Sequence, residues 1–151
     1  MPHYVSRGSI PGKRHTVHKI DGEHTYEELV SRAGFSDIYS NLYHLHMPTS
    51  LRSLGPVEPM PLEALEDETH RPRHMLTARF EAGGDFLSGR RFLGFNNDCT
   101  LAVCEPTENA DWFYRNGQAD ELVFVHYGTG TLETMYGDLN FHPGDYVVIP
   151  K

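Results

Sequence analysis

The stretches Glu121-Leu-Val-Phe-Val-His-Tyr-Gly128 and Asp138-Leu-Asn-Phe-His-Pro-Gly-Asp-Tyr-Val-Val-Ile-Pro150 decide the fold of this chain. Each carries a short apolar run, as does the segment between them, and glycine, proline or aspartate separates one run from the next. Runs of this length with turn residues between them are typical of antiparallel strands. We therefore predict strands at Leu122–Tyr127, Leu132–Tyr136 and Tyr146–Ile149.

The same pattern extends back to Arg73. Further apolar runs lie at Met75–Phe80, Phe92–Phe95 and Thr100–Cys104, and turn residues such as Gly83-Gly84-Asp85 separate them. Many short strands at this spacing favour an antiparallel sandwich over alternating strand–helix units. The prediction is an all-β fold with minor helix, in the form of a jelly-roll β-sandwich.

The first part of the chain has a different pattern. Residues 1–24 show no amphipathic period and predict an irregular arm. Thr25 is typical of a helix N-cap, so we predict a short helix from there to about Gly34. Tyr39–Met47 is rich in aromatic and aliphatic residues and predicts a strand.

A proline-rich and acidic segment follows at residues 55–72. It predicts a surface connection with one helical turn at Leu62–Glu66. The predicted organisation is then an N-terminal arm with a short helix and strand over 1–54, the connection over 55–72, and a β-sandwich core over 73–151.

Composition restricts the compartment. The 151 residues have the length of one domain, and no apolar window is long enough to span a membrane. The opening Met1-Pro2-His3-Tyr4 lacks the layout of a signal peptide. Cys99 and Cys104 lie five residues apart, so on one strand they would face opposite sides and could not form a disulfide. We therefore predict a cytoplasmic protein with reduced thiols.

Charge is unevenly distributed along a chain of net charge −8. His3–Lys19 is basic and holds no acid, whereas Glu58–Glu68 is acidic and holds no base. A basic arm can touch nucleic acid, but no nucleic-acid-binding motif accompanies this one. We expect the arm to contact the rest of the protein or a neighbouring subunit, and we expect neither a nucleic-acid nor a membrane partner.

The C-terminal stretches resemble the double motif of the cupin superfamily, which reads G-x5-H-x-H-x3/4-E-x6-G and then G-x5-P-x-G-x2-H-x3-N. Glu121 with Gly128 matches E-x6-G, and Gly144 with Pro150 matches G-x5-P. Two histidines and a carboxylate can form a facial triad that holds a divalent metal. In this chain the H-x-H positions fall on Arg115 and Gly117, neither of which is a metal ligand.

A degenerate, metal-free cupin is therefore predicted for this portion of the chain. Glu121 is expected to be a structural residue at a strand start, paired with Arg115. His126 and His142 lie nearby but do not occupy the ligand positions of the motif. The second motif is interrupted after Pro150, so the jelly roll is expected to be incomplete at its C-terminus and the chain to be part of a longer polypeptide.

Several blocks resemble homogentisate 1,2-dioxygenases, in the order in which that family carries them. The matching blocks are Met1-Pro-His-Tyr4, Gly8-Ser-Ile-Pro-Gly-Lys-Arg-His-Thr16, Tyr26-Glu-Glu-Leu29, Gly34-Phe-Ser36, Leu42-Tyr-His-Leu-His-Met-Pro-Thr49, Arg71-Pro-Arg-His74, Gly89-Arg-Arg-Phe-Leu-Gly-Phe-Asn96 and Tyr114-Arg-Asn116.

This resemblance implies an enzyme with two cupin halves and one Fe(II) in the C-terminal half, held by two histidines and a glutamate outside this chain. It implies ring cleavage of homogentisate by O₂ to maleylacetoacetate, in tyrosine and phenylalanine catabolism, by a trimer or higher homo-oligomer. The role implied for this portion is scaffold and assembly, with the C-terminal cupin half as its partner. No catalytic, cofactor-binding or metal-binding residue of the family is carried over onto this chain.

Three local features allow a functional interpretation, but a simpler one is favoured for each. The pair His44 and His46 has the i, i+2 spacing of a metal site, but no acid follows at the required distance, so a hydrogen-bonded pair on one sheet face is favoured. The cluster His70, Arg71, Arg73 and His74 could bind an anion, but ion pairs with Glu63, Glu66 or Asp67 are favoured. A nucleophilic role for either cysteine is disfavoured, because Glu105 is its sole nearby partner in sequence.

Two alternatives to the homogentisate interpretation stay open at this point. The chain could be a stand-alone, metal-free cupin that serves as a binding module. It could also be part of another ring-cleaving dioxygenase with two cupin halves, such as a gentisate-type enzyme, because fold alone does not fix the substrate.

Overall fold

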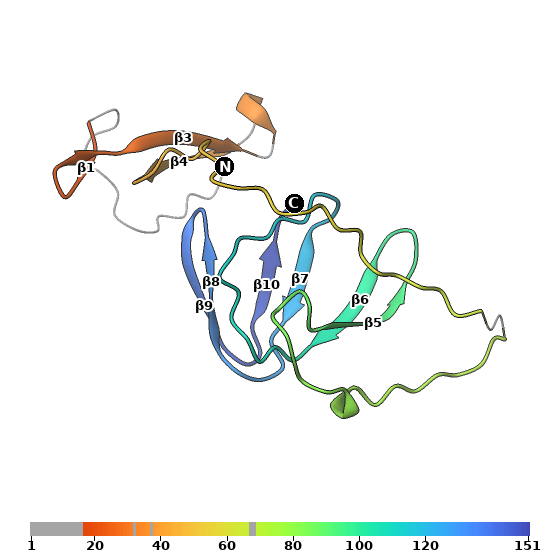
Figure 1. Ribbon diagram of the computed structural model, residues 1–151. Helices are drawn as coiled ribbons and strands as arrows, with labels where there is room; N and C mark the ends of the chain where they lie inside the picture. The colour runs from red at the N-terminus through yellow and green to blue at the C-terminus, as the bar shows by residue number, and fades with distance from the viewer. Residues whose placement is uncertain (1–16, 32, 37, 67–68) are drawn as a thin grey trace. The chain divides into compact units, whose positions relative to one another are not determined.

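The computed structural model describes residues 17–31, 33–36, 38–66 and 69–151. Its regular elements are almost all strands (Figure 1). They are β1 (Lys19–Ile20), β2 (Glu23–His24), β3 (Tyr26–Ser31), η1 (Gly34–Ser36), β4 (Tyr39–His44), η2 (Thr77–Arg79), β5 (Arg90–Phe95), β6 (Thr100–Cys104), β7 (Glu121–Phe124), β8 (Gly130–Thr134), β9 (Gly137–Phe141) and β10 (Tyr146–Ile149). The two η elements are single 3₁₀ turns.

These strands pair two by two, as β1–β2, β3–β4, β5–β6, β8–β9 and β7–β10. The predicted all-β, jelly-roll-like class is confirmed, although the described strands close no barrel. No helix among the described residues is long and apolar enough to cross a membrane.

Internal contacts divide the chain into two compact units, which we describe separately. The first consists of Met1–Pro56 with Thr131–Leu139, and the second of Val57–Gly130 with Asn140–Lys151. The first unit contains the β1–β2 hairpin, whose two turn residues Asp21 and Gly22 have φ values of 52° and 86°. Aspartate followed by glycine is the sequence that such a tight hairpin turn prefers.

The predicted helix after Thr25 is wrong, because this segment is strand β3. It pairs antiparallel with β4, from Tyr26 opposite His44 to Ser31 opposite Tyr39. A helix of so few residues is marginal on its own, whereas pairing with a neighbouring strand satisfies the backbone groups that face that strand. The hydroxyl of Thr25 donates to the carbonyl of His18 at 2.9 Å instead of capping a helix.

Other boundaries also differ from the prediction. Met75–Phe80 contains the 3₁₀ turn η2 rather than a strand, and Leu62–Glu66 contains no helical turn. The predicted strand Tyr39–Met47 is confirmed as β4, but it ends at His44. Strand β9 was not predicted, because Gly137-Asp-Leu-Asn-Phe141 alternates polar and apolar residues over a very short run.

The second unit positions the candidate site. Strands β5 and β6 pair from Arg90 opposite Cys104 to Phe95 opposite Thr100, with a bulge between Phe92 and Gly94. Strands β7 and β10 pair from Glu121 opposite Ile149 to Phe124 opposite Tyr146. Among the described residues, the buried hydrophobic side chains are Val125 and Val147, each 7% exposed.

A tight turn leads into β10 at His142–Asp145. The amide of Asp145 donates to the carbonyl of His142 at 3.1 Å, and Gly144 has a φ of 93°. Proline at the second position and a left-handed glycine at the third are the features of a type II turn. The amide of His142 also donates to Oδ2 of Asp145 at 2.7 Å, which closes the turn from its other side.

Replacing this glycine should therefore strain the turn. We expect Gly144→Ala to lower the free energy of unfolding by about 1 kcal/mol, because a side chain disfavours the left-handed region. The effect is measurable by urea unfolding. Gly117→Ala is the control, since Gly117 has open space around it and no positive φ. Equal losses in the two variants would contradict the turn argument.

Candidate functional site

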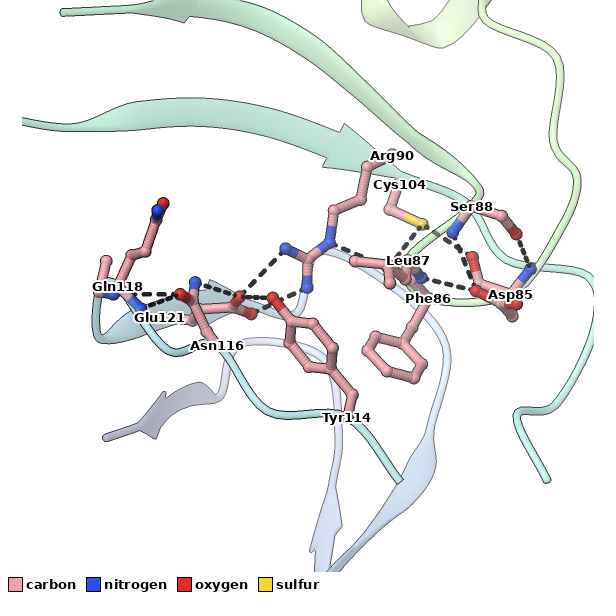
Figure 2. Close-up of polar contacts among 11 residues, drawn as sticks. Asp85, Phe86, Leu87, Ser88, Arg90, Cys104, Tyr114, Asn116, Gln118 and Glu121 are labelled. Carbon is pink, nitrogen blue, oxygen red and sulfur yellow. Dashed lines mark hydrogen bonds and ion pairs between the residues drawn. The ribbon is translucent and has the colours of Figure 1, made fainter. Parts of the chain in front are cut away.

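Glu121, the glutamate of the cupin-like motif, begins strand β7 and is held by an arginine from β5 (Figure 2). Nη2 of Arg90 donates to Oε2 of Glu121 at 2.8 Å, and Nη1 donates to Oε1 at 3.2 Å. The two side chains are 18% and 11% exposed. This forked arrangement of two parallel bonds is the strongest geometry for an arginine–carboxylate pair.

Two further donors reach the same carboxylate from the loop that precedes β7. The hydroxyl of Tyr114 donates to Oε1 of Glu121 at 2.8 Å, and Nδ2 of Asn116 donates to Oε1 at 2.9 Å. The other end of Asn116 is fixed, because its Oδ1 accepts the amides of Gln118 and Ala119. The loop is thus tied to the start of β7 by side-chain bonds to one carboxylate.

Arg90 is itself fixed by its surroundings. Its Nε donates to the carbonyl of Phe86 at 3.1 Å, and its guanidinium lies 5.9 Å from the ring centre of Phe86 and 5.6 Å from that of Tyr114. Phe86 also packs edge-on against Tyr114 and tilted against Trp112. Aromatic rings attract a cation at these distances, so the orientation of Arg90 is set on several sides.

The turn that carries Arg90 into β5 is closed by reciprocal side-chain bonds. Oδ1 of Asp85 accepts the amides of Leu87 and Ser88 at 2.8 and 2.9 Å, and Oγ of Ser88 accepts the amide of Asp85 at 3.0 Å. The carbonyl of Gly84 accepts the amides of Thr107 and Glu108. This turn is therefore anchored to the segment that follows β6.

The electrostatics of the site favour the ionised pair. Burial acts to raise the pKa of Glu121, but hydrogen bonds from Arg90, Asn116 and Tyr114 outweigh it and leave that pKa below its usual value. Burial acts to lower the pKa of Arg90, yet the bond to Glu121 leaves it raised. Burial, and then donation to Glu121, raise the pKa of Tyr114. Glu121 is consequently a carboxylate and Tyr114 a neutral donor near neutral pH.

The prediction for Glu121 is partly confirmed. It lies at a strand start, but its ion-pair partner is Arg90, 31 residues earlier, and not Arg115. Arg90, Tyr114 and Asn116 were not predicted as members of the site. They fall within the blocks Gly89–Asn96 and Tyr114–Asn116 that carry the family resemblance, but nothing in those blocks assigns them a partner.

A metal bound through Glu121 does not fit this geometry. Oε1 already accepts three hydrogen bonds and Oε2 accepts one, and the guanidinium occupies the side that a cation would need. Within the described part of the chain, no three histidine, cysteine, aspartate or glutamate side chains lie close enough to hold a metal ion. His126 stands beside Phe124 and Tyr127, and His142 lies 3.8 Å from Asp145.

The histidine pair on β4 does not act as a unit. Nε2 of His44 lies 2.7 Å from Oε2 of Glu28, which comes from the neighbouring strand β3, whereas His46 lies beyond the end of β4. His18, which precedes β1, stacks on Tyr43 of β4 with ring centres 4.9 Å apart. The predicted hydrogen-bonded pair of His44 and His46 on one sheet face is therefore only partly confirmed, because His44 bonds Glu28 and His46 lies outside the strand.

The remaining clusters add no reactive group. The proposed ion pairs of the segment from His70 to His74 with Glu63 or Glu66 stay a prediction, and Asp67 lies outside the described residues. Cys99 and Cys104 are both free thiols. Burial raises the pKa of the Cys104 thiol, which Arg90 only partly offsets, so this thiol is not activated as a nucleophile.

The chain is 33% identical, over its whole length, to a protein of Saccharolobus solfataricus named "Putative dioxygenase". It spans 40% of the length of that relative. No protein-family model matches the chain, and no solved structure matches it.

Proposed function

We propose that this chain is the N-terminal, metal-free cupin portion of an Fe(II)-dependent dioxygenase that opens the aromatic ring of homogentisate. The observation that carries the oxygenase assignment is the 33% identity, across all of this chain, to the archaeal protein named as a dioxygenase. The ordered sequence blocks from Met1 to Asn116 favour homogentisate over other aromatic substrates. The engaged carboxylate of Glu121 supports a metal-free role for this portion.

In this proposal the iron lies in a C-terminal cupin half, held by two histidines and a glutamate. Such an iron supplies adjacent open positions for the substrate and O₂. The residues of this chain act as scaffold: Arg90 and Glu121 join β5 to β7, and Tyr114 and Asn116 hold the intervening loop. We also propose a cytoplasmic homo-oligomer, a trimer or larger, in which the basic arm contributes contacts.

Oxygen uptake by the full-length polypeptide tests the proposal. After anaerobic loading with Fe(II), we expect homogentisate to drive O₂ consumption and gentisate to do so at least about tenfold more slowly, because a pocket shaped for one ring acid discriminates against another. The chain of 151 residues alone, treated in the same way, should consume none.

The assay distinguishes the substrates and the roles. Uptake with gentisate but not homogentisate would mean that gentisate is the substrate, and it would leave the proposed scaffold role of this chain unchanged. Uptake by the isolated chain would contradict the metal-free role. No uptake with either acid, from a polypeptide shown to contain iron, would contradict ring cleavage of these substrates.

A further inference from the structure

The Arg90 guanidinium lies directly against the carboxylate of Glu121, the glutamate of the cupin-like motif. We infer that Arg90 is a permanent internal cation that takes the place of a metal. The second unit is then held together by the ion pair of Arg90 and Glu121, here called the pin, and its stability does not respond to divalent ions. This inference rests on the geometry of the site. It stands or falls separately from the ring cleavage proposed above.

The first argument is the number of bonds to Glu121. A carboxylate has about four lone-pair positions, and Arg90, Tyr114 and Asn116 direct four bonds of 2.8–3.2 Å at it, three to Oε1 and one to Oε2. A metal that bridged both oxygens would have to displace at least one of these donors. The guanidinium cannot lose its proton to make room, because its pKa lies far above neutral.

The second argument is the connection that the pin makes. Glu121 receives bonds from β5 through Arg90, and from the loop before β7 through Tyr114 and Asn116. A structural metal joins separate chain segments in the same way, by drawing ligands from each of them. Here a carboxylate at the centre and an arginine fork do this with covalently attached groups, so no ion has to be acquired.

The third argument is that Arg90 is pre-positioned. Phe86 accepts its Nε bond, and the rings of Phe86 and Tyr114 lie beside its charged group. Little side-chain freedom is therefore lost when the fork meets Glu121. By contrast, its neighbour Arg91 is exposed, and its Nη1 makes a long bond of 3.5 Å to the carbonyl of Arg90.

The test is thermal unfolding of the purified chain of 151 residues, without the proposed iron-binding half, in the presence of EDTA, Mn(II) or anaerobic Fe(II). We expect the melting temperature of the unsubstituted protein to move by less than about 1 °C with any of them, and Arg90→Met to lower it by about 8 °C or more. Adding Mn(II) or Fe(II) should not restore the melting temperature of Arg90→Met. Arg91→Met, on the exposed side of the same strand, is the matched control and should change it by less than about 2 °C.

The double variant Arg90→Met with Glu121→Gln separates charge from packing. It removes both charges and keeps an amide oxygen as acceptor for Tyr114 and Asn116. We expect it to recover at least half of the loss, because an apolar replacement for a buried pair is often tolerated, whereas one unpaired charge is not. If Arg90→Met alone does not fold, the double variant still should.

Three outcomes would overturn the inference. The first is restoration of Arg90→Met by either metal, which would show an ordinary cation site. The second is one equivalent of metal bound by the unsubstituted protein and lost in Glu121→Gln. The third is a double variant no more stable than Arg90→Met, which would show that the pair of charges is not what the fold depends on.

Discussion

Gly89→Ala is expected to lower the free energy of unfolding by at least about 3 kcal/mol, because an added methyl group would collide with backbone atoms. A Cβ at this position would lie 2.3 Å from the carbonyl oxygen of Gly83 and 2.8 Å from that of Asp85. Both neighbours are backbone atoms. Neither can turn aside as the end of a flexible side chain could.

The surrounding bonds prevent the turn from opening to relieve this clash. The amide of Gly89 donates to the carbonyl of Asp85 at 2.9 Å, and the amide of Gly83 donates to the carbonyl of Glu105 at 3.0 Å. Moving Gly83 away would break the second bond, and moving Gly89 would shift Arg90 from Glu121. Strain at Gly89 is therefore expected to disturb the bonds between Arg90 and Glu121.

Urea unfolding followed by circular dichroism measures the effect. Gly94→Ala is the control, because Gly94 lies on β5, the strand that Gly89 immediately precedes, with nothing within 4 Å of an added Cβ and no positive φ. It should change stability by less than about 0.5 kcal/mol. A Gly89→Ala variant as stable as the control would mean that the turn is looser than its hydrogen bonds indicate.

The sequence predicted the fold class because its evidence is local. The segments Thr100–Cys104 and Tyr146–Ile149 were predicted with the same limits that β6 and β10 have in the structure. Each is a β-branched or aromatic run with turn residues beside it, and such a run needs no distant information to be recognised.

Strand β3 was misread for the opposite reason. Thr25 and the acids after it are a genuine local helix signal, but they are outweighed by a partner strand that begins at Tyr39. A local sequence pattern carries no information about hydrogen bonds that form with a strand further along the chain. The same limit hid η2, where an apolar run finds no partner strand among the described residues.

The candidate site shows this limit most clearly. The motif located Glu121, and the missing H-x-H excluded the usual ligand set. Its partner was assigned to Arg115 because that is the basic residue nearest in sequence. The fold instead brings Arg90 to it, through a turn that depends on Gly84 and Gly89. Which arginine meets this carboxylate depends on how β5 and β7 are placed in space, and a single sequence does not show that.

Glu121→Gln is expected to lower the free energy of unfolding by about 3 kcal/mol at neutral pH, because Arg90 would be left as a mostly buried charge without a counter-charge. The amide keeps the size of the side chain and one acceptor oxygen. Loss of packing therefore does not explain the change. Unfolding by urea at pH 7 measures it, and Glu133→Gln on the exposed side of β8 is the control, with an expected change below about 0.5 kcal/mol.

The same substitution should change how the free energy of unfolding depends on pH below neutrality, here called the acid limb. The pKa of Glu121 is lower in the folded protein than its ordinary value of 4.5, so the folded state binds fewer protons than the unfolded state in this range. Its contribution is therefore fully present above about pH 4.5 and is lost as the pH falls through the folded pKa. In Glu121→Gln this part of the pH dependence disappears, and stability should fall less steeply below pH 4.5. Asp85, whose pKa is lowered by the amides of Ser88 and Leu87, remains and keeps part of the acid limb. Parallel acid limbs in the two proteins would mean that Glu121 is not ionised more easily when folded, and the pin would lose its electrostatic basis.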